Sequence, residues 1–194
     1  MSFRALACCV AMVVCSPTVH AQSSEPLPFR AGQWGAEFTV ANQNVGTLLR
    51  FRAPDRALAF NVSGGGNWRL SGDATSPESR TIQLGLAVRR YRSLVRSVVG
   101  FTSIGGEVQY TGFNNAAPVG TLSGSFVGVG ATAGAGAQWF VLPRLSIGAN
   151  VNAALRLTQE TSRTGVPFGS PTTRRSTALG LSFGTFGLTG AIYF

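Results

Sequence analysis

The chain ends in TALGLSFGTFGLTGAIYF, residues 177–194, and this stretch decides the fold. Because side chains alternate across a β-strand, it predicts a strand with one apolar face and one face of small, mostly polar residues. Leu179, Leu181 and Phe183 stand on the parity opposite to the apolar face, so we expect either a β-bulge near Gly184 or an upper part clear of a membrane. Counting back from the end, the apolar face carries Phe194, Ile192, Gly190, Leu188 and Phe186, and the other face carries Tyr193, Ala191, Thr189, Gly187 and Thr185.

The amino terminus has the pattern of a cleaved secretory signal peptide. Arg4 is followed by an apolar run over residues 5–14 and by the small-residue pattern Val19-His20-Ala21. We therefore expect a signal peptide at residues 1–21, a short and poorly ordered leader at residues 22–31, and one domain over residues 32–194. All three cysteines and the single histidine fall within the signal peptide. The exported chain then has neither residue, which excludes Ser–His and Cys–His nucleophile pairs and histidine-dependent metal sites.

Alternation of apolar and polar residues continues through seven earlier segments, with no helical period between them. The turn at Gln43-Asn44 is tight, and so are the second, fourth and sixth connections, whereas the third, fifth and seventh are long and polar. Connections that alternate in length in this way are expected of an even-stranded barrel with short turns at one rim and long loops at the other. The expected strands are residues 34–40, 45–53, 57–70, 82–89, 96–110, 122–141, 145–158 and 177–194. The tight connections are Pro54–Arg56, Arg90–Leu94 and Leu142–Arg144, and the long ones are Ser71–Ser79, Thr111–Thr121 and Gln159–Arg175.

The apolar face is expected on the outside of this barrel, against membrane lipid. A soluble lipocalin-like barrel, with its apolar face lining a cavity, is the alternative. Small, polar and charged residues crowd the opposite face, as a narrow eight-stranded barrel requires of its interior. Aromatic residues also form two expected girdles, with Trp34, Phe51, Trp139, Tyr193 and Phe194 near the tight turns and Trp68 and Tyr110 near the loops. The sequence thus predicts an all-β fold: an eight-stranded, antiparallel, up-and-down transmembrane β-barrel.

A strand that stops on an aromatic residue resembles the closing strand of bacterial outer-membrane β-barrels of the eight-stranded OmpA/OmpX type. In that family the barrel assembly machinery reads the terminal aromatic, which implies an assembly signal at Phe194 with Ile192 and Tyr193. The family usually has an aromatic residue at the position of Ile192, and here Tyr193 is displaced from it by one residue. The resemblance implies location in the bacterial outer membrane, with outer-membrane lipid and the assembly machinery as partners.

Charged side chains on the inward parity predict a network inside the barrel. A two-residue turn at Gln43-Asn44 would place Glu37 directly opposite Arg50. These charges either form salt bridges that hold a filled barrel together or leave a positive lumen that attracts anions, and Phe101 and Phe126 also fall on the inward parity. The expected lumen charges are Glu37, Arg50, Arg52, Arg69, Arg89, Glu107 and Arg156, of which Arg69, Glu107 and Arg156 lie at similar depth.

The remaining charges point to membrane contacts rather than to nucleic acid. The net charge is +9, but the arginines are scattered along strand-like segments, which argues against a nucleic-acid partner. Arg163, Arg174 and Arg175 can meet lipopolysaccharide phosphates or simply be solvated. The carboxylates of Asp73 and Glu78 fit a solvated loop. Basic residues of the tight turns, which can touch phospholipid headgroups, are Arg56, Arg90, Arg92 and Arg144.

These observations predict a small outer-membrane barrel with a structural or surface-interaction role and no catalytic, metal or cofactor site. The alternative is a narrow porin-like barrel that passes or binds small anionic or amphipathic solutes. A lipid-modifying barrel enzyme is disfavoured, because only a carboxylate-based site is open to a chain without histidine.

Overall fold

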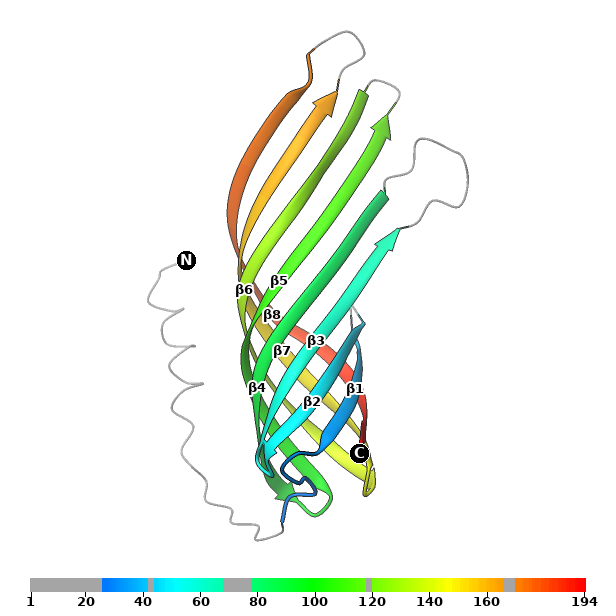
Figure 1. Ribbon diagram of the computed structural model, residues 1–194, viewed down its shortest axis with the longest axis vertical. Coiled ribbons are helices and arrows are strands. Elements are labelled where there is room, and N and C mark those ends of the chain that lie inside the picture. The colour runs from blue at the N-terminus through cyan, green and yellow to red at the C-terminus, as the bar shows by residue number, and fades with distance from the viewer. Residues whose placement is uncertain (1–25, 42–43, 68–77, 118–119, 166–169) are drawn as a thin grey trace.

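The computed structural model describes residues 26–41, 44–67, 78–117, 120–165 and 170–194 (Figure 1). The predicted signal peptide and part of the predicted leader lie outside these residues. Within them, no helix has the length and hydropathy that a membrane crossing requires. The strands are β1 (Trp34–Val40), β2 (Val45–Ala53), β3 (Arg56–Asn67), β4 (Glu78–Val95), β5 (Val98–Ala117), β6 (Gly120–Leu142), β7 (Leu145–Gly165) and β8 (Thr172–Tyr193).

The eight strands form a closed barrel in which each strand pairs with its neighbour in sequence. The ring closes where β1 pairs antiparallel with β8. At its end, the Trp34 amide donates to the Phe194 carbonyl and the Phe194 amide donates to the Trp34 carbonyl, both at 2.9 Å. The predicted eight-stranded antiparallel barrel is confirmed.

One end of the barrel carries the tight turns together with the start of β1 and the end of β8 (Figure 1). The turn predicted at Arg90–Leu94 is wrong, because β4 continues to Val95 and the chain reverses at Arg96-Ser97. Ser97 accordingly adopts a φ of 66°, in the left-handed region. Tyr91 explains the longer strand, since its ring is buried inside the barrel and so continues the alternation.

At the opposite end, two of the predicted long loops are mostly strand. β5 continues to Ala117 and β6 begins at Gly120, while β7 continues to Gly165 and β8 begins at Thr172. Strand pairing uses backbone hydrogen bonds, so a ladder can continue through Ser, Thr and Asn after the apolar residues end. The polarity of these segments therefore marks the end of the apolar belt rather than the end of the strands. The predicted loop Ser71–Ser79 lies mostly outside the described residues, and β4 begins at Glu78.

The wall of the barrel has two unequal parts. β1 and β2 have 7 and 9 residues, whereas β5–β8 have 20 to 23. Pairing between β1 and β8 stops at Val40 and Leu188, beyond which β8 continues, paired with β7. Figure 1 shows the long strands rising well past the short β1–β2 hairpin. The end with the tight turns is thus a closed tube, and the other end is a curved sheet of longer hairpins.

A register shift in β8 places both sets of its apolar residues on the outer face. The pairing of β7 with β8 shifts between Asn152 and Ala154, opposite the segment of β8 that contains Gly184. Of the two alternatives that the sequence left open for this strand, the structure has the bulge. The exposed apolar side chains on either side of it are Leu179, Leu181 and Phe183, and Phe186, Leu188 and Ile192.

Exposed apolar side chains form a belt around the outside of the tube. On β4, the side chains of Ile82, Leu84, Leu86 and Val88 are exposed, and the residues between them face inward. A soluble barrel with an apolar interior would show the reverse, so the lipocalin-like alternative is excluded. Trp139 and Phe194 (53% and 64% exposed) lie at one margin of the belt and Tyr110 at the other, as predicted for girdles. Trp68 lies outside the described residues.

Candidate functional site: the barrel lumen

An aromatic plug fills the lumen at the end with the tight turns. The ring of Phe29 stacks on Phe51 at 4.2 Å between centroids and lies 4.8 Å from Tyr91 and 5.2 Å from Tyr193. Aromatic rings prefer such stacked and tilted contacts, and close packing leaves no room for water. We define the plug as Phe29, Phe51, Tyr91, Phe101, Phe140 and Tyr193.

The centre of the plug comes from the predicted leader. Phe29 is only 3% exposed, so the expected lack of order in the leader is wrong for this part. Gly32 has a φ of +83°, which glycine adopts without steric cost, and its amide donates to the Phe51 carbonyl at 2.8 Å. This turn directs the chain before β1 into the mouth of the barrel.

A buried charged layer lies next to the plug. Arg89 donates from both terminal nitrogens to the two carboxylate oxygens of Glu37, each at 2.8 Å. The Gln138 amide also donates to Glu37 at 2.7 Å, and the Tyr193 hydroxyl donates to Gln138 at 2.7 Å. The guanidinium of Arg89 lies 4.6 Å from the ring centroid of Phe101, a cation–π distance. The layer of Glu37, Arg89 and Gln138 is thus tied to the plug through Tyr193 and Phe101.

The predicted pair of Glu37 with Arg50 is wrong. Glu37 lies opposite Thr47, and Arg50 lies opposite Trp34. Arg50 and Arg52 point outward, whereas Leu49 and Phe51 are fully buried inside. The predicted turn at Gln43-Asn44 gave a register that is wrong by three residues, and a shift by an odd number of residues moves every side chain of a strand to the other face. Phe51 and Tyr193 are therefore plug residues and do not belong to the predicted girdle.

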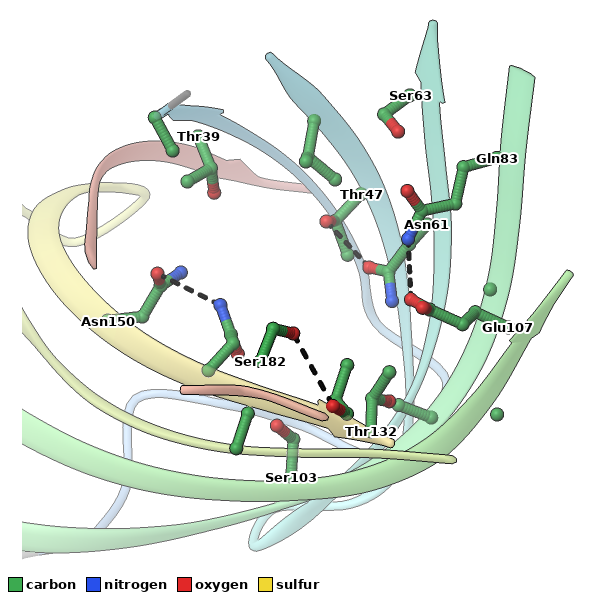
Figure 2. A pocket seen from close by; sticks show the side chains of 18 of the residues that line it. Thr39, Thr47, Asn61, Ser63, Gln83, Ser103, Glu107, Thr132, Asn150 and Ser182 are labelled. Atoms are coloured by element: carbon green, nitrogen blue, oxygen red, sulfur yellow. Dashed lines mark hydrogen bonds between the residues drawn. The ribbon is translucent and has the colours of Figure 1, made fainter. Parts of the chain in front are cut away.

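Beyond the charged layer, the lumen opens into a polar cavity of about 330 Å³ (Figure 2). Its lining is dominated by uncharged hydrogen-bonding side chains. Two of the bonds drawn in Figure 2 run from the Thr47 hydroxyl to Asn61 at 2.8 Å and from the Asn152 amide to Asn150 at 3.3 Å. The polar lining residues include Thr39, Thr47, Asn61, Ser63, Gln83, Ser103, Thr132, Asn150, Asn152 and Ser182.

A second ion pair lies at the side of this cavity. Arg156 donates from Nε to Glu107 at 2.9 Å and from a terminal nitrogen to the same oxygen, while Gln83 donates to the other oxygen. The side chain of Glu107 is 7% exposed and that of Arg156 is 30% exposed. The structure therefore brings together two of the three charges expected at this depth. The third, Arg69, lies outside the described residues.

The described lumen is electrically balanced rather than strongly positive. Arg89 is paired with Glu37 and Arg156 with Glu107, and the predicted excess of positive charge is lost because Arg50 and Arg52 face outward. Phe101 lies in the plug as expected, whereas Phe126 is half-buried and lies 5.2 Å from Phe113. In the described part of the chain, no three His, Cys, Asp or Glu side chains gather as metal ligands.

Sequence reasoning missed three groups that complete the closed end: Phe29, Tyr91 and Gln138. Gln138 could have been found, because it falls on the glycine-rich inward face of β6. Tyr91 was missed because the segment that contains it was assigned to a turn. Phe29 precedes the first strand, so no periodic pattern marks it.

Comparison with known proteins adds information on the fold alone. No protein-family model and no curated protein matches the chain. Among solved structures, it is similar to a major outer membrane protein from Thermus thermophilus, with 14% identity, coverage of 84% of this chain and 97% of that one, and a TM-score of 0.56.

Two further solved structures are also similar, each with a TM-score of 0.44. They are the N-terminal β-barrel domain of Pseudomonas aeruginosa OprF, at 13% identity over 84% of this chain and 96% of that one, and Neisserial surface protein A (NspA), at 12% identity over 84% and 94%. The chain thus has the fold of a small outer-membrane β-barrel. The resemblance found in the sequence is confirmed at the level of fold.

Proposed function

We propose that this protein is a non-conducting, non-catalytic barrel of the bacterial outer membrane with a structural or surface-interaction role. The observation that carries the proposal is the closure of the lumen by two successive layers. The aromatic plug packs against the Glu37–Arg89–Gln138 layer, and the two charged side chains of that layer are 0% and 7% exposed. An ion that crosses would have to displace both a packed core and a bidentate ion pair.

The long hairpins support the surface-interaction part of the proposal. β5 and β6 stay paired out to Ala117 and Gly120, and β7 and β8 out to Thr164 and Thr172. In a barrel with short periplasmic turns, these hairpins face the cell exterior. Paired strands hold their polar side chains in place, so a partner would bind them with less loss of conformational entropy than it would mobile loops.

Planar-bilayer recording tests the closed lumen. The refolded protein should give no steady conductance, and insertion should be verified by different gel migration before and after boiling. Steady anion-selective channels that shrink in Arg156→Gln would overturn the proposal in favour of a porin-like barrel. The polar cavity beyond the charged layer can hold a small solute without passing it, so binding of a solute without conductance would leave the closed lumen intact.

Trypsin treatment of intact cells tests location and orientation. The chain has no lysine, so trypsin can cut it only after arginine. Arg163, Arg174 and Arg175 are exposed on the long hairpins and should be accessible from outside. Arg56 and Arg144 at the tight turns should be cut only after the cells are permeabilised. Cleavage of the tight turns in intact cells, or recovery of the chain in the soluble periplasm, would contradict the proposal.

A further inference from the structure

The outer face of β2, β3 and β4 carries a cluster of arginines at the end with the tight turns. Arg56 and Arg90 are direct cross-strand partners. Arg52 lies at the register shift between Phe51 and Ala53, next to the partner position of Arg56. The side chains all point outward and are exposed. We define the arginine row as Arg50, Arg52, Arg56, Arg90 and Arg92.

The arginine row has little negative charge to balance it. Asp55 pairs with Arg56 at 3.3 Å, and both side chains are more than half exposed. The other acidic side chains that the structure describes lie in the lumen, at Glu37 and Glu107, or at the far end, at Glu78 and Glu160. Like charges on directly opposed strand positions repel each other. An anion between the guanidinium groups would relieve that repulsion.

The position of the row along the barrel indicates which anion. The apolar belt begins two residues further from the tight turns on each strand. Its first residues are Leu48 after Arg50, Leu58 after Arg56 and Val88 after Arg90. Arg50 lies over the ring of Trp34 at 5.1 Å, and tryptophan favours the interface between membrane and water. The guanidinium groups therefore lie where the phosphates of a lipid leaflet begin, with the apolar belt beside the acyl chains.

The opposite wall of the barrel is different at the same end. There the outward residues of β6 are apolar and exposed at Trp139 and Leu142, and the exposed arginines of the described turns beside β6 are Arg96 and Arg144. The positive charge is thus concentrated on one side of the barrel and does not form a uniform ring.

We propose that the arginine row is a binding site for the phosphate group of an anionic phospholipid in the leaflet at the tight turns. Arginine suits this ligand because its planar guanidinium donates two parallel hydrogen bonds to one phosphate, and adjacent strands bring neighbouring guanidinium groups within reach of the same headgroup. This inference rests on the proposed membrane location. It goes beyond that proposal by assigning a lipid class and a side of the barrel.

Lipid-quenching of tryptophan fluorescence can test the site. Trp34 lies beside the row and Trp139 on the opposite wall, so the pair of variants Trp68→Phe/Trp139→Phe and Trp34→Phe/Trp68→Phe gives one reporter each. Each variant is refolded into vesicles of phosphatidylcholine and brominated phosphatidylglycerol. It is then refolded into vesicles in which the phosphatidylcholine is brominated and the phosphatidylglycerol is not. Quenching of Trp34 should show that phosphatidylglycerol is preferred over phosphatidylcholine by about fivefold, which is the ratio expected for one well-placed arginine. Quenching of Trp139 should show a ratio of the two lipids near one.

Substitution of the row supplies the decisive comparison. Arg52→Gln/Arg56→Gln/Arg90→Gln should lower the preference at Trp34 toward that at Trp139, with the remainder due to Arg50 and Arg92, whereas the matched Arg→Lys triple should retain more of it. Raising the salt concentration should lower the preference at Trp34 alone, and this measurement tests the site even if the Gln triple does not fold.

Equal preference at both tryptophans, or an unchanged preference in a folded Gln triple, would overturn the site. If millimolar glycerol phosphate abolishes the preference at Trp34, the arginine row binds soluble phosphates instead of a lipid headgroup. Failure to insert would contradict the membrane location and not this site.

Discussion

The lumen holds two Glu–Arg pairs with similar chemistry in different surroundings. Glu37 and Arg89 lie next to the aromatic plug, with Gln138 bonded to Glu37, and both charged side chains are almost completely buried. Glu107 and Arg156 lie beside an open polar cavity, where Arg156 keeps 30% of its side-chain surface exposed. Because water can solvate the second pair when it breaks but cannot easily reach the first, the two pairs should differ mainly in what happens after one partner is lost.

The difference extends to the packing around each pair. Near Glu37 the inward residues are large, with Phe51, Tyr91 and Phe101 filling the tube. Near Glu107 they are small and polar, as at Asn61 and Ser103. One end of the lumen therefore behaves as a protein core and the other as a hydrated vestibule.

The largest effect is expected from Glu37→Ala. It leaves the buried guanidinium of Arg89 without its carboxylate, which should destabilise the barrel by about 3–5 kcal/mol. Urea unfolding of the protein in lipid vesicles, followed by tryptophan fluorescence, measures the loss, with Glu78→Ala as the control. Glu37→Ala/Arg89→Ala should recover part of it. A double variant as unstable as the sum of the two single variants would contradict the pairing.

Phe29→Ala should have the next effect. It removes a buried ring from the centre of the plug, which should cost about 2 kcal/mol in the same unfolding assay. Phe29→Leu, which keeps most of the apolar volume, serves as the matched control and should lose clearly less. If the two variants unfold alike, the leader does not contribute to the packed end of the barrel.

Glu107→Ala should be milder than Glu37→Ala, although it also removes the partner of an arginine. Arg156 can turn toward the cavity and be hydrated, so we expect a loss of about 1.5 kcal/mol, typical of a hydrogen bond to a charged group. The ratio of the two losses, measured under one set of conditions, tests the contrast between core and vestibule directly. A loss at Glu107 equal to that at Glu37 would refute it.

Deletion of Phe194 should have the smallest effect on the finished barrel. Its side chain is exposed, and its backbone makes two hydrogen bonds with Trp34, so refolded protein should lose about 1 kcal/mol. In cells, the amount of assembled barrel should fall strongly, because the predicted assembly signal is lost. Equal amounts of assembled protein with and without Phe194 would show that Ile192, in place of an aromatic residue, already disables the signal.

Alternation predicted the barrel and most of its faces, but it failed at two places for the same reason. In β2, the apolar residues Leu49 and Phe51 were assigned to the lipid, and in β4 the basic segment around Tyr91 was assigned to a turn. Both belong to the closed end, where the interior is as apolar as the membrane. A pattern of apolar and polar residues cannot separate these two environments, because both exclude water.

The sequence by itself determined the number of strands, the outward belt and the inward position of Glu37, Arg89, Glu107 and Arg156, because the period of two is a local property of the strand backbone. Only the tertiary structure decided that Glu37 pairs with Arg89, 52 residues away, and that Phe29 fills the mouth. Contacts across a lumen depend on how far each strand is staggered and tilted around the ring. That stagger is set by the pairing of all eight strands together, and no single segment of the sequence contains it.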